Sequence, residues 1–273
     1  MTDQYAVFGN PIEHSKSPSI HQAFAENTGQ NMQYTKQCID IDGFVEAADT
    51  FFAGKGKGLN ITVPFKLDAY AYANQLSKRA RQAGAVNTLI KQNDGSILGD
   101  NTDGYGIMLD IQTNLHWDVK GKTVVILGAG GAVRGILGPL LVAQPAKVFI
   151  ANRTVEKALQ LAQAFSREGN IEGLGFEQLP HHAADIIING TSASLAGDLP
   201  PVPEAIIGEN TQCYDMMYGK KATVFMQWAN NLGAKNSADG LGMLVGQAAE
   251  SFRCWRGVLP GTQAVIQHIR ASL

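Results

Sequence analysis

A glycine-rich turn in the middle of the chain has the composition of a phosphate-binding loop. Residues 123–134 read TVVILGAGGAVR, which is an apolar strand, a glycine turn and the start of a helix. Such a turn points backbone N–H groups and the positive end of a helix dipole at a phosphate. Val133 occupies the last glycine position of the G-x-G-x-x-G pattern, and glycines also serve ordinary tight turns. The turn alone therefore favours a dinucleotide and leaves a purely structural role open.

The end of the next expected strand indicates which dinucleotide would bind. About 20 residues after the turn, an NAD-binding domain carries an acidic residue that holds the ribose 2′-hydroxyl. Here the end of the next expected strand carries Asn152, Arg153 and Thr154. An arginine fork binds a 2′-phosphate that a carboxylate would repel. The sequence therefore predicts NADP, with Lys157 either as a second cation for the phosphate or as an ordinary solvated residue.

A lysine follows a strand and a proline in the first third of the chain. The segment GLNITVPFK at 58–66 places Asn60 and Thr62 on one face of a strand, alternating with apolar residues. At the carboxyl end of a strand such a face can bind a ligand, and Lys66 then begins the following helix. A lysine there is also commonly a solvated surface residue. Asp103 opens another helix. Its carboxylate would either cap the N-terminus of that helix or belong to a site.

Two serines flank a lysine near the N-terminus. Ser15 and Ser17 precede Pro18 in the segment GNPIEHSKSP at 9–18. Ser17 suits the N-cap of a helix with Pro18 as its first residue, which would explain that serine structurally. Gln247 lies in an expected helix, where a polar side chain by default faces solvent. Individually, these polar residues do not distinguish a site from a surface.

Taken together, these segments resemble the shikimate dehydrogenase family. The resemblance covers nearly the whole chain, and its motifs occur in the family's order at matching intervals. The eight matching segments are residues 9–18, 59–66, 84–88, 99–104, 128–132, 152–154, 214–216 and 246–248. Two small departures are Gln22 after His21, where the family often has asparagine, and Met217 in place of a frequent aromatic residue. Neither is expected to remove a catalytic group.

The resemblance implies the reversible reduction of 3-dehydroshikimate to shikimate with NADPH, in the biosynthesis of aromatic amino acids. By motif position, Lys66 and Asp103 would form the catalytic pair. Ser15 and Ser17 would bind the substrate carboxylate, which Tyr218 would also reach. The ring hydroxyls would be held by Asn60, Thr62, Asn87, Asp103 and Gln247.

The same resemblance assigns residues to the cofactor. The pyrophosphate would lie on the glycine turn, formed by Gly128, Ala129, Gly130, Gly131 and Ala132. The adenosine 2′-phosphate would be held by Asn152, Arg153 and Thr154, with Lys157 as a helper. The ribose or nicotinamide would lie near Thr191, Met216 and Gly240. This chemistry requires no metal, and the sequence indicates none.

The types of these residues suit such a reaction. Hydride transfer to a ketone develops negative charge on oxygen, which needs a proton or cation beside it. Lys66 can supply both, while Asp103 orients it and binds a neighbouring hydroxyl. Three rivals remain: a quinate/shikimate dehydrogenase of broader cofactor range, a reductase of the same plan acting on a folate or an acyl-tRNA, and a non-catalytic NADP-binding module. An acidic residue at the second strand end would favour the first rival, and loss of the lysine–aspartate pair would favour the others.

The composition fits an ordinary enzyme with a small-molecule substrate. The 273 residues carry a net charge of −2, with 45% hydrophobic and 17% charged residues. The chain lacks a long basic run that would suggest nucleic acid and an apolar run long enough to span a bilayer. Cys38, Cys213 and Cys254 are far apart and lack metal-ligand spacing, which favours a reducing compartment. With no recognisable secretory signal, we expect a cytoplasmic enzyme, either a monomer or a homodimer.

Alternating strand-like and helix-like segments predict an α/β fold with two domains. An N-terminal α/β substrate domain would comprise residues 1–103 with 239–273, and a Rossmann-type NADP-binding domain would comprise 104–238. Because ligands bind at carboxyl ends of strands and between domains, we expect the catalytic cleft between the two. Strands are expected at 5–9, 33–39, 58–62, 86–91, 185–189 and 212–215 and from 123 and 147 onward, the one at 185–189 being buried on both faces. Helices are expected at 18–27, 43–52, 65–74, 222–231, 244–256 and near 262–271, and from 131 and 154 onward.

Overall fold

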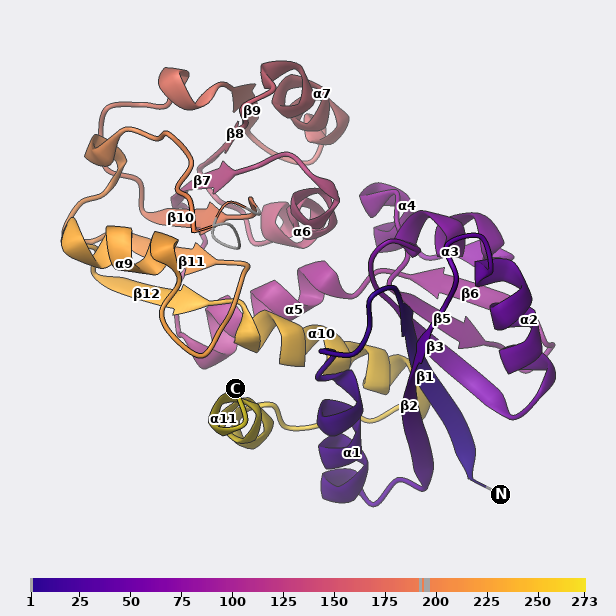
Figure 1. The fold of residues 1–273 in the computed structure, drawn as a ribbon. Coiled ribbons are helices and arrows are strands. Elements are labelled where there is room, and N and C mark those ends of the chain that lie inside the picture. The colour runs from indigo at the N-terminus through magenta and orange to yellow at the C-terminus, as the bar shows by residue number, and fades with distance from the viewer. Residues whose placement is uncertain (1, 192, 194–196) are drawn as a thin grey trace. The chain divides into compact units, whose positions relative to one another are not determined.

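The chain folds into two compact α/β units. The structure is a computed structural model that describes residues 2–191, 193 and 197–273 (Figure 1). The first unit comprises residues 1–106 and 244–272, and the second comprises 107–243 with Leu273. The chain leaves the first unit within helix α5 (Asp103–Leu109) and returns to it within helix α10 (Leu241–Arg256). Each unit contains its own sheet, which fits the predicted α/β class with two domains.

The first unit contains a mixed six-stranded sheet in the order β2-β1-β3-β5-β6-β4. Strands β1, β2 and β3 run parallel to one another, whereas β5 is antiparallel to both β3 and β6. The strands are β1 (Asp3–Gly9), β2 (Met32–Cys38), β3 (Gly56–Ile61), β4 (Gln75–Leu76), β5 (Thr88–Lys91) and β6 (Ile97–Asp100). The carboxyl ends of β1 and β3 therefore point the same way, which places the loops that follow them at one edge of the sheet.

Helices cover both faces of this sheet because its strands alternate apolar side chains between them. Phe8 on β1 packs with Phe44 and Phe65 on the face covered by α2 and α3. Tyr5, on the opposite face, packs against Trp255 of α10 with ring centroids 4.8 Å apart. The helices are α1 (Ser17–Thr28), α2 (Phe44–Ala53), α3 (Lys66–Tyr72), α4 (Lys78–Ala83), α10 and α11 (Gln263–Ala271).

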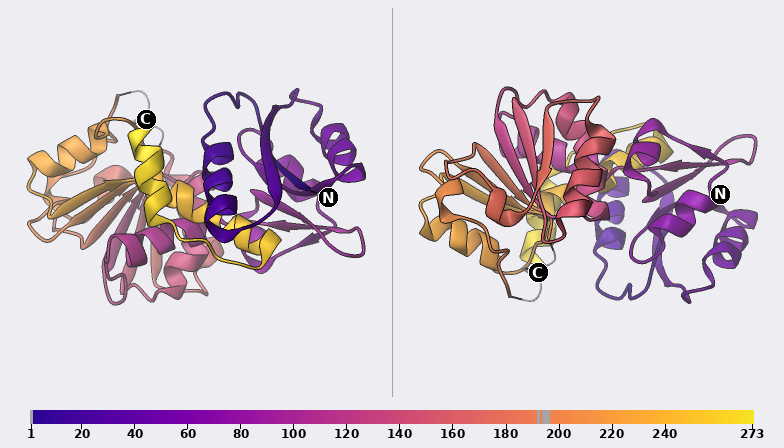
Figure 2. Two further views of the ribbon diagram at one scale, coloured as in Figure 1. Left: turned by 90° about the horizontal axis from the view of Figure 1, so that it is seen from below. Right: turned by 90° about the horizontal axis from the view of Figure 1, so that it is seen from above.

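The second unit contains a six-stranded sheet in which every pair of neighbours is parallel, in the order β12-β11-β10-β7-β8-β9. Figure 2 shows its strands as a twisted fan. They are β7 (Thr123–Leu127), β8 (Lys147–Ala151), β9 (Ile171–Leu174), β10 (Ile186–Asn189), β11 (Gln212–Asp215) and β12 (Asn236–Asp239). All four residues of β10 are buried, as the sequence predicts for a strand covered on both faces.

Two separate cores lie on the two faces of this second sheet. Val124 and Ile126 of β7 belong to the core under helices α6 and α7, and Val125 and Leu127 belong to the core under α9. The helices are α6 (Gly131–Val142), α7 (Val155–Phe165) and α9 (Val224–Asn231), with a π-helical turn at Asp110–Asn114 and 3₁₀ turns at Phe176–Gln178 and Glu204–Ile206. A parallel sheet with helices on both faces is the doubly wound arrangement that binds dinucleotides.

The sequence leaves several short elements unpredicted and misplaces one helix cap. The elements not predicted are β4, β6, α4, β9 and β12. Helix α1 starts at Ser17 itself, and its N-cap is Lys16, whose side chain makes no capping hydrogen bond. The prediction that Ser17 caps this helix is therefore wrong. Within the described ranges, the structure has no helix with the length and apolar character needed to cross a membrane.

Candidate functional site

Lys66 and Asp103 form a close ion pair in the first unit. Lys66 is the first residue of α3, just after β3, and Asp103 is the first residue of α5, just after β6. The Lys66 Nζ atom lies 2.6 Å from Asp103 Oδ2, and the two side chains are 31% and 11% exposed. The backbone N–H of Asp103 donates to Asn101 Oδ1 at 3.1 Å. The Asp103 carboxylate is thus used in the ion pair, while Asn101 serves the helix terminus.

The buried Asn87 amide holds the other oxygen of Asp103. Its Nδ2 donates to Asp103 Oδ1 at 2.8 Å, and its Oδ1 accepts the backbone N–H of Thr102 at 2.9 Å. A backbone N–H can only donate, so the orientation of this amide is determined rather than arbitrary. Both carboxylate oxygens of Asp103 therefore have fixed donors. Lys66 is held at a defined position with part of its side chain exposed.

Three buried hydroxyls surround Asn87. Ser251 Oγ lies 2.8 Å from Thr88 Oγ1 and 3.2 Å from Thr102 Oγ1, and all three residues are fully buried. Gln247 Oε1 lies 3.4 Å from both Asn87 Nδ2 and Thr102 Oγ1. Ser251 was not identified from the sequence, although it follows Gln247 by four residues and so lies on the same face of α10. That spacing was the available signal.

Asn60 joins this network from β3. Its Nδ2 lies 3.0 Å from Ser251 Oγ, 3.2 Å from Thr88 Oγ1 and 3.3 Å from the carbonyl oxygen of Asn87. Its Oδ1 accepts the Tyr34 hydroxyl at 2.7 Å. Both ends of the amide are therefore bonded within the protein. Thr62, just beyond the end of β3, is half-buried and donates its backbone N–H to Phe8 at 3.0 Å.

The two serines predicted to bind a carboxylate lie at the start of α1. Ser15 is half-buried, and its Oγ accepts the backbone N–H of Ser17 at 3.3 Å. Ser17 is buried. Tyr34 joins the network of Asn60, because its hydroxyl donates to Asn60 Oδ1 at 2.7 Å. Tyr34 was not identified from the sequence, since a strand tyrosine normally indicates only core.

The glycine turn of the second unit leaves open space at the start of α6. Gly128 has a positive φ of 106°, and a Cβ there would lie 3.1 Å from the carbonyl oxygen of Gly190. A Cβ on Gly130 or Gly131 would meet nothing within 4 Å. Ala132 is exposed and Ala129 is half-buried. The helix N-terminus is thus accessible to a pyrophosphate, which fits the predicted dinucleotide.

The residues predicted to hold the 2′-phosphate follow β8. Arg153, Thr154 and Lys157 are exposed, and the Asn152 side chain donates to the backbone oxygen of Thr154 at 2.8 Å. Arg153 forms no ion pair with any residue that the structure describes. An exposed guanidinium at this strand end fits a phosphate ligand.

The remaining predicted ligands of the cofactor lie at neighbouring strand ends. Thr191 follows β10, and its hydroxyl donates to Asn189 Oδ1 at 2.7 Å. Met216 follows β11, and Gly240 follows β12, where a Cβ would lie 2.2 Å from the carbonyl oxygen of Met216. Position 240 therefore requires glycine. Tyr218 also belongs to the second unit, and burial followed by the Asp239 carboxylate raises the pKa of its phenol, so its hydroxyl stays protonated at neutral pH.

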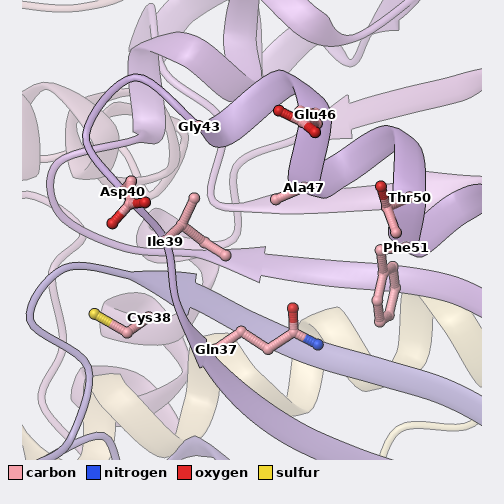
Figure 3. A pocket seen from close by; sticks show the side chains of 9 residues that line it. All are labelled: Gln37, Cys38, Ile39, Asp40, Gly43, Glu46, Ala47, Thr50 and Phe51. Atoms are coloured by element: carbon pink, nitrogen blue, oxygen red, sulfur yellow. The ribbon is translucent and has the colours of Figure 1, made fainter.

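A separate pocket in the first unit does not suit an acidic substrate. It has a volume of about 460 Å³ and lies between the end of β2 and helix α2 (Figure 3). The carboxylates of Asp40 and Glu46 line it together with Gln37 and Phe51, and none of the predicted site residues does. In the part of the chain that the structure describes, no cluster of histidine, cysteine and acidic residues could hold a metal ion.

Comparisons with known proteins agree on one family. Three family models match: "Shikimate dehydrogenase substrate binding domain" at residues 7–89, "Shikimate / quinate 5-dehydrogenase" at 110–196 and "Shikimate 5'-dehydrogenase C-terminal domain" at 240–270. A shikimate dehydrogenase (NADP(+)) of Cellvibrio japonicus (strain Ueda107) is 58% identical, over 100% of this chain and 99% of that protein.

Solved structures agree in fold over nearly the full length. The crystal structure of an Ael1 enzyme from Pseudomonas putida is 43% identical, with a TM-score of 0.92 and 98% of each chain covered. That of shikimate 5-dehydrogenase from Thermus thermophilus, in complex with NADP(H) and shikimate, is 30% identical, with a TM-score of 0.86 and 100% of each chain covered.

Proposed function

Because the chain belongs to the shikimate dehydrogenase family, we propose that it catalyses the reversible, NADP-dependent reduction of 3-dehydroshikimate to shikimate. The reaction belongs to the pathway that leads to chorismate and the aromatic amino acids. The observation that carries the proposal is the Lys66–Asp103 pair, whose second carboxylate oxygen is held by the oriented amide of Asn87.

Lys66 and Asp103 can provide the charge stabilisation and the proton transfer that the reaction needs. NADPH, when bound, supplies the hydride. The Lys66 ammonium stands beside the substrate ketone, where it stabilises the negative charge that develops on oxygen and donates a proton to it. Asp103 keeps the ammonium in place and accepts a hydrogen bond from a neighbouring ring hydroxyl. In the oxidation of shikimate, Lys66 takes the proton back.

The substrate residues act as a set of directed hydrogen-bonding groups. The carboxylate binds to Ser15 and Ser17, with Tyr218 as a further donor. The ring hydroxyls are recognised by Asn60, Thr62, Asn87, Asp103 and Gln247. Such a polar site rejects analogues that leave its groups without partners.

The cofactor residues lie at the carboxyl ends of the second sheet. The pyrophosphate would be held by the turn formed by Gly128, Ala129, Gly130, Gly131 and Ala132. The 2′-phosphate would be held by Asn152, Arg153, Thr154 and Lys157. Thr191, Met216 and Gly240 would hold the ribose and nicotinamide. Open space before α6 and the exposed guanidinium support this placement.

We also propose that the enzyme works in the cytoplasm as a monomer or homodimer, without nucleic acid or membrane partners. Its three free cysteines fit a reducing compartment.

The test is cofactor reduction by the purified protein with shikimate or quinate and with NADP or NAD, in all four combinations. Turnover chiefly with shikimate and NADP is expected. Comparable turnover with quinate or NAD would instead assign the broader quinate/shikimate activity. Binding of NADP with no turnover in any combination would refute catalysis and leave a binding module.

A further inference from the structure

An arginine that the proposed mechanism does not use joins two buried carboxylates. Arg79 lies on α4, Asp100 ends β6 and Glu250 lies on α10. Arg79 Nε and Nη2 donate to Oδ1 and Oδ2 of Asp100 at 2.7 Å and 2.6 Å, and Arg79 Nη1 lies 2.7 Å from Glu250 Oε1. The two carboxylate side chains are only 7% and 1% exposed, so they depend on cationic partners within the protein.

The planar guanidinium of Arg79 aligns both carboxylates at once. Two of its nitrogens face Asp100 and a third faces Glu250, an arrangement that a lysine ammonium cannot reproduce. Arg253 makes a second bidentate contact with Glu250, at 2.7 Å to each oxygen, but from the same helix. Cys254 Sγ lies 3.5 Å from Arg79 Nη2 and 3.8 Å from Asp100 Oδ2. Of the two arginines, Arg79 is therefore the one that connects α10 to the end of β6.

The Asp100 end of this bridge supports the backbone that carries Asp103. Asp100 Oδ1 also accepts the backbone N–H of Asn101 at 2.8 Å, and the backbone carbonyl of Asp100 accepts that of Asn87 at 3.0 Å. Asn101 Oδ1 in turn accepts the backbone N–H of Asp103 at 3.1 Å. The side chain of Arg79 thus anchors the start of the loop at whose end Asp103 lies.

The Glu250 end of the bridge holds the helix that carries Gln247. Residues three apart are neighbours on a helix surface, so Gln247 lies beside Glu250. Gln247 Oε1 is 3.4 Å from both Asn87 Nδ2 and Thr102 Oγ1, near the limit for a hydrogen bond. The hydroxyl of Ser251, 3.2 Å from Thr102 Oγ1, is a further neutral link between the helix and the loop. The contacts of the arginine bridge are shorter than these and join charged groups, so they are stronger.

We propose that Arg79 is a positioning residue that sets the spacing between Gln247 and the loop of Asp103, and so fits the site to the ring hydroxyls of the substrate. The inference rests on the proposed function, in which Asp103 and Gln247 bind those hydroxyls. A polyhydroxylated ring must reach both groups at the same time. Hydrogen bonds are lost beyond about 3.5 Å, so a shift of about half an ångström in either group would remove one. Because Asn87 holds the Asp103 carboxylate independently, the loss should affect substrate binding more than kcat.

The variant Arg79→Lys tests this role because it keeps a positive charge beside the two buried carboxylates and removes the fork that aligns them. The matched control is Arg81→Lys, the same substitution at an exposed position of α4, where the guanidinium donates to the carbonyl oxygen of Leu76. We expect KM for shikimate to rise about three- to thirtyfold in Arg79→Lys, with a smaller loss in kcat and an unchanged KM for NADP. Arg81→Lys should keep all three constants at the parent values.

A double-mutant cycle with Gln247→Ala separates positioning from a general effect on folding. Without the Gln247 amide there is one contact fewer to misplace. Arg79→Lys should therefore raise KM for shikimate clearly less in Gln247→Ala than in the parent protein. Equal factors in the two backgrounds would refute the action through Gln247.

The variant Glu250→Gln keeps the proposal testable if Arg79→Lys does not fold. Glutamine has the shape of glutamate, and its Oε1 can still accept from Arg79, but the hydrogen bond loses the charge of its acceptor. We expect KM for shikimate to rise about two- to fivefold, and again less in the Gln247→Ala background. Thermal unfolding identifies which variants are folded, and an unshifted KM in those variants, with an active parent protein, would refute the positioning role alone. A parent protein that turns over no shikimate would refute the proposed function and this role together.

Discussion

Replacing Lys66 with alanine should slow catalysis by about three orders of magnitude. An ammonium about 4 Å from a developing oxyanion contributes about 4 kcal/mol at an effective dielectric of about 20. That dielectric suits this side chain because it is 31% exposed. Each 1.36 kcal/mol corresponds to about one decade in rate. Because the charge appears mainly in the transition state, we expect the loss in kcat and a much smaller change in KM.

The matched variant Lys66→Arg separates charge from proton transfer. Arginine keeps a cation beside Asp103 but stays protonated throughout the accessible pH range. Stopped-flow and steady-state rates of NADPH formation from shikimate, measured across pH, would compare the two variants. If the charge alone matters, Lys66→Arg should recover most of the lost rate, and if proton donation matters it should stay near Lys66→Ala. A kcat for Lys66→Ala within a factor of a few of the parent value would refute the mechanism.

Three further predictions concern the cofactor site and stability. Arg153→Ala should weaken NADP binding by about 10- to 100-fold, because a charged hydrogen bond to the 2′-phosphate is lost. NAD binding should be unchanged in fluorescence titrations, and equal losses for the two cofactors would contradict a 2′-phosphate contact. Gly128→Ala should lower the unfolding free energy by about 1–3 kcal/mol because its φ of 106° is strained for alanine. Gly130 has extended backbone and open space around it, so Gly130→Ala should keep the melting temperature of the parent protein and lose NADP affinity. Equal melting temperatures for Gly128→Ala and Gly130→Ala would contradict the backbone strain expected in Gly128→Ala. The pKa of His21 is about 3 in the folded protein and about 6.5 in the unfolded chain. Because the unfolded chain takes up the proton first as the pH drops, the unfolding free energy should fall between pH about 6.5 and 3. Urea unfolding between pH 7.5 and 5 should show a shallower slope for His21→Gln, and an unchanged slope would exclude this titration.

The fold was predictable where strands carry apolar runs. The segment at 185–189 is a strand because its isoleucines are buried on both faces, and the structure has β10 there. By contrast, β12 reads Asn-Ser-Ala-Asp and lies at the edge of its sheet, so its pairing with β11 rather than its composition makes it a strand. Helix α4 was missed because four of its six residues are polar, although Ser77 caps it and Gly84 ends it with a positive φ. Those two capping residues were the usable local signals.

The residues of the candidate site also differ in whether the sequence could identify them. Lys66, Asp103 and Gln247 could be identified because their segments match motifs of the family; by itself, a polar residue at a strand end or in a helix does not distinguish a site from a surface. Tyr34 could not, because a tyrosine in a strand is common in cores, and the only signal for Ser251 was its spacing of four residues from Gln247. Their relation to the site depends on which strands and helices meet in space, a property that no local pattern contains.

The backbone N–H of Thr102 that fixes the Asn87 amide has a consequence for how the site tolerates mutation. A main-chain donor is present in every amino acid except proline. The contact that orients Asn87 is therefore insensitive to the side chain at position 102, and random substitution there cannot reverse the amide while the loop keeps its path. Position 87 has no such latitude, since aspartate would set a second carboxylate against Asp103 and leucine would leave Thr102 without an acceptor. The donor of this hydrogen bond is therefore kept wherever the backbone keeps its path. Only the acceptor, the side chain at position 87, depends on which amino acid is encoded.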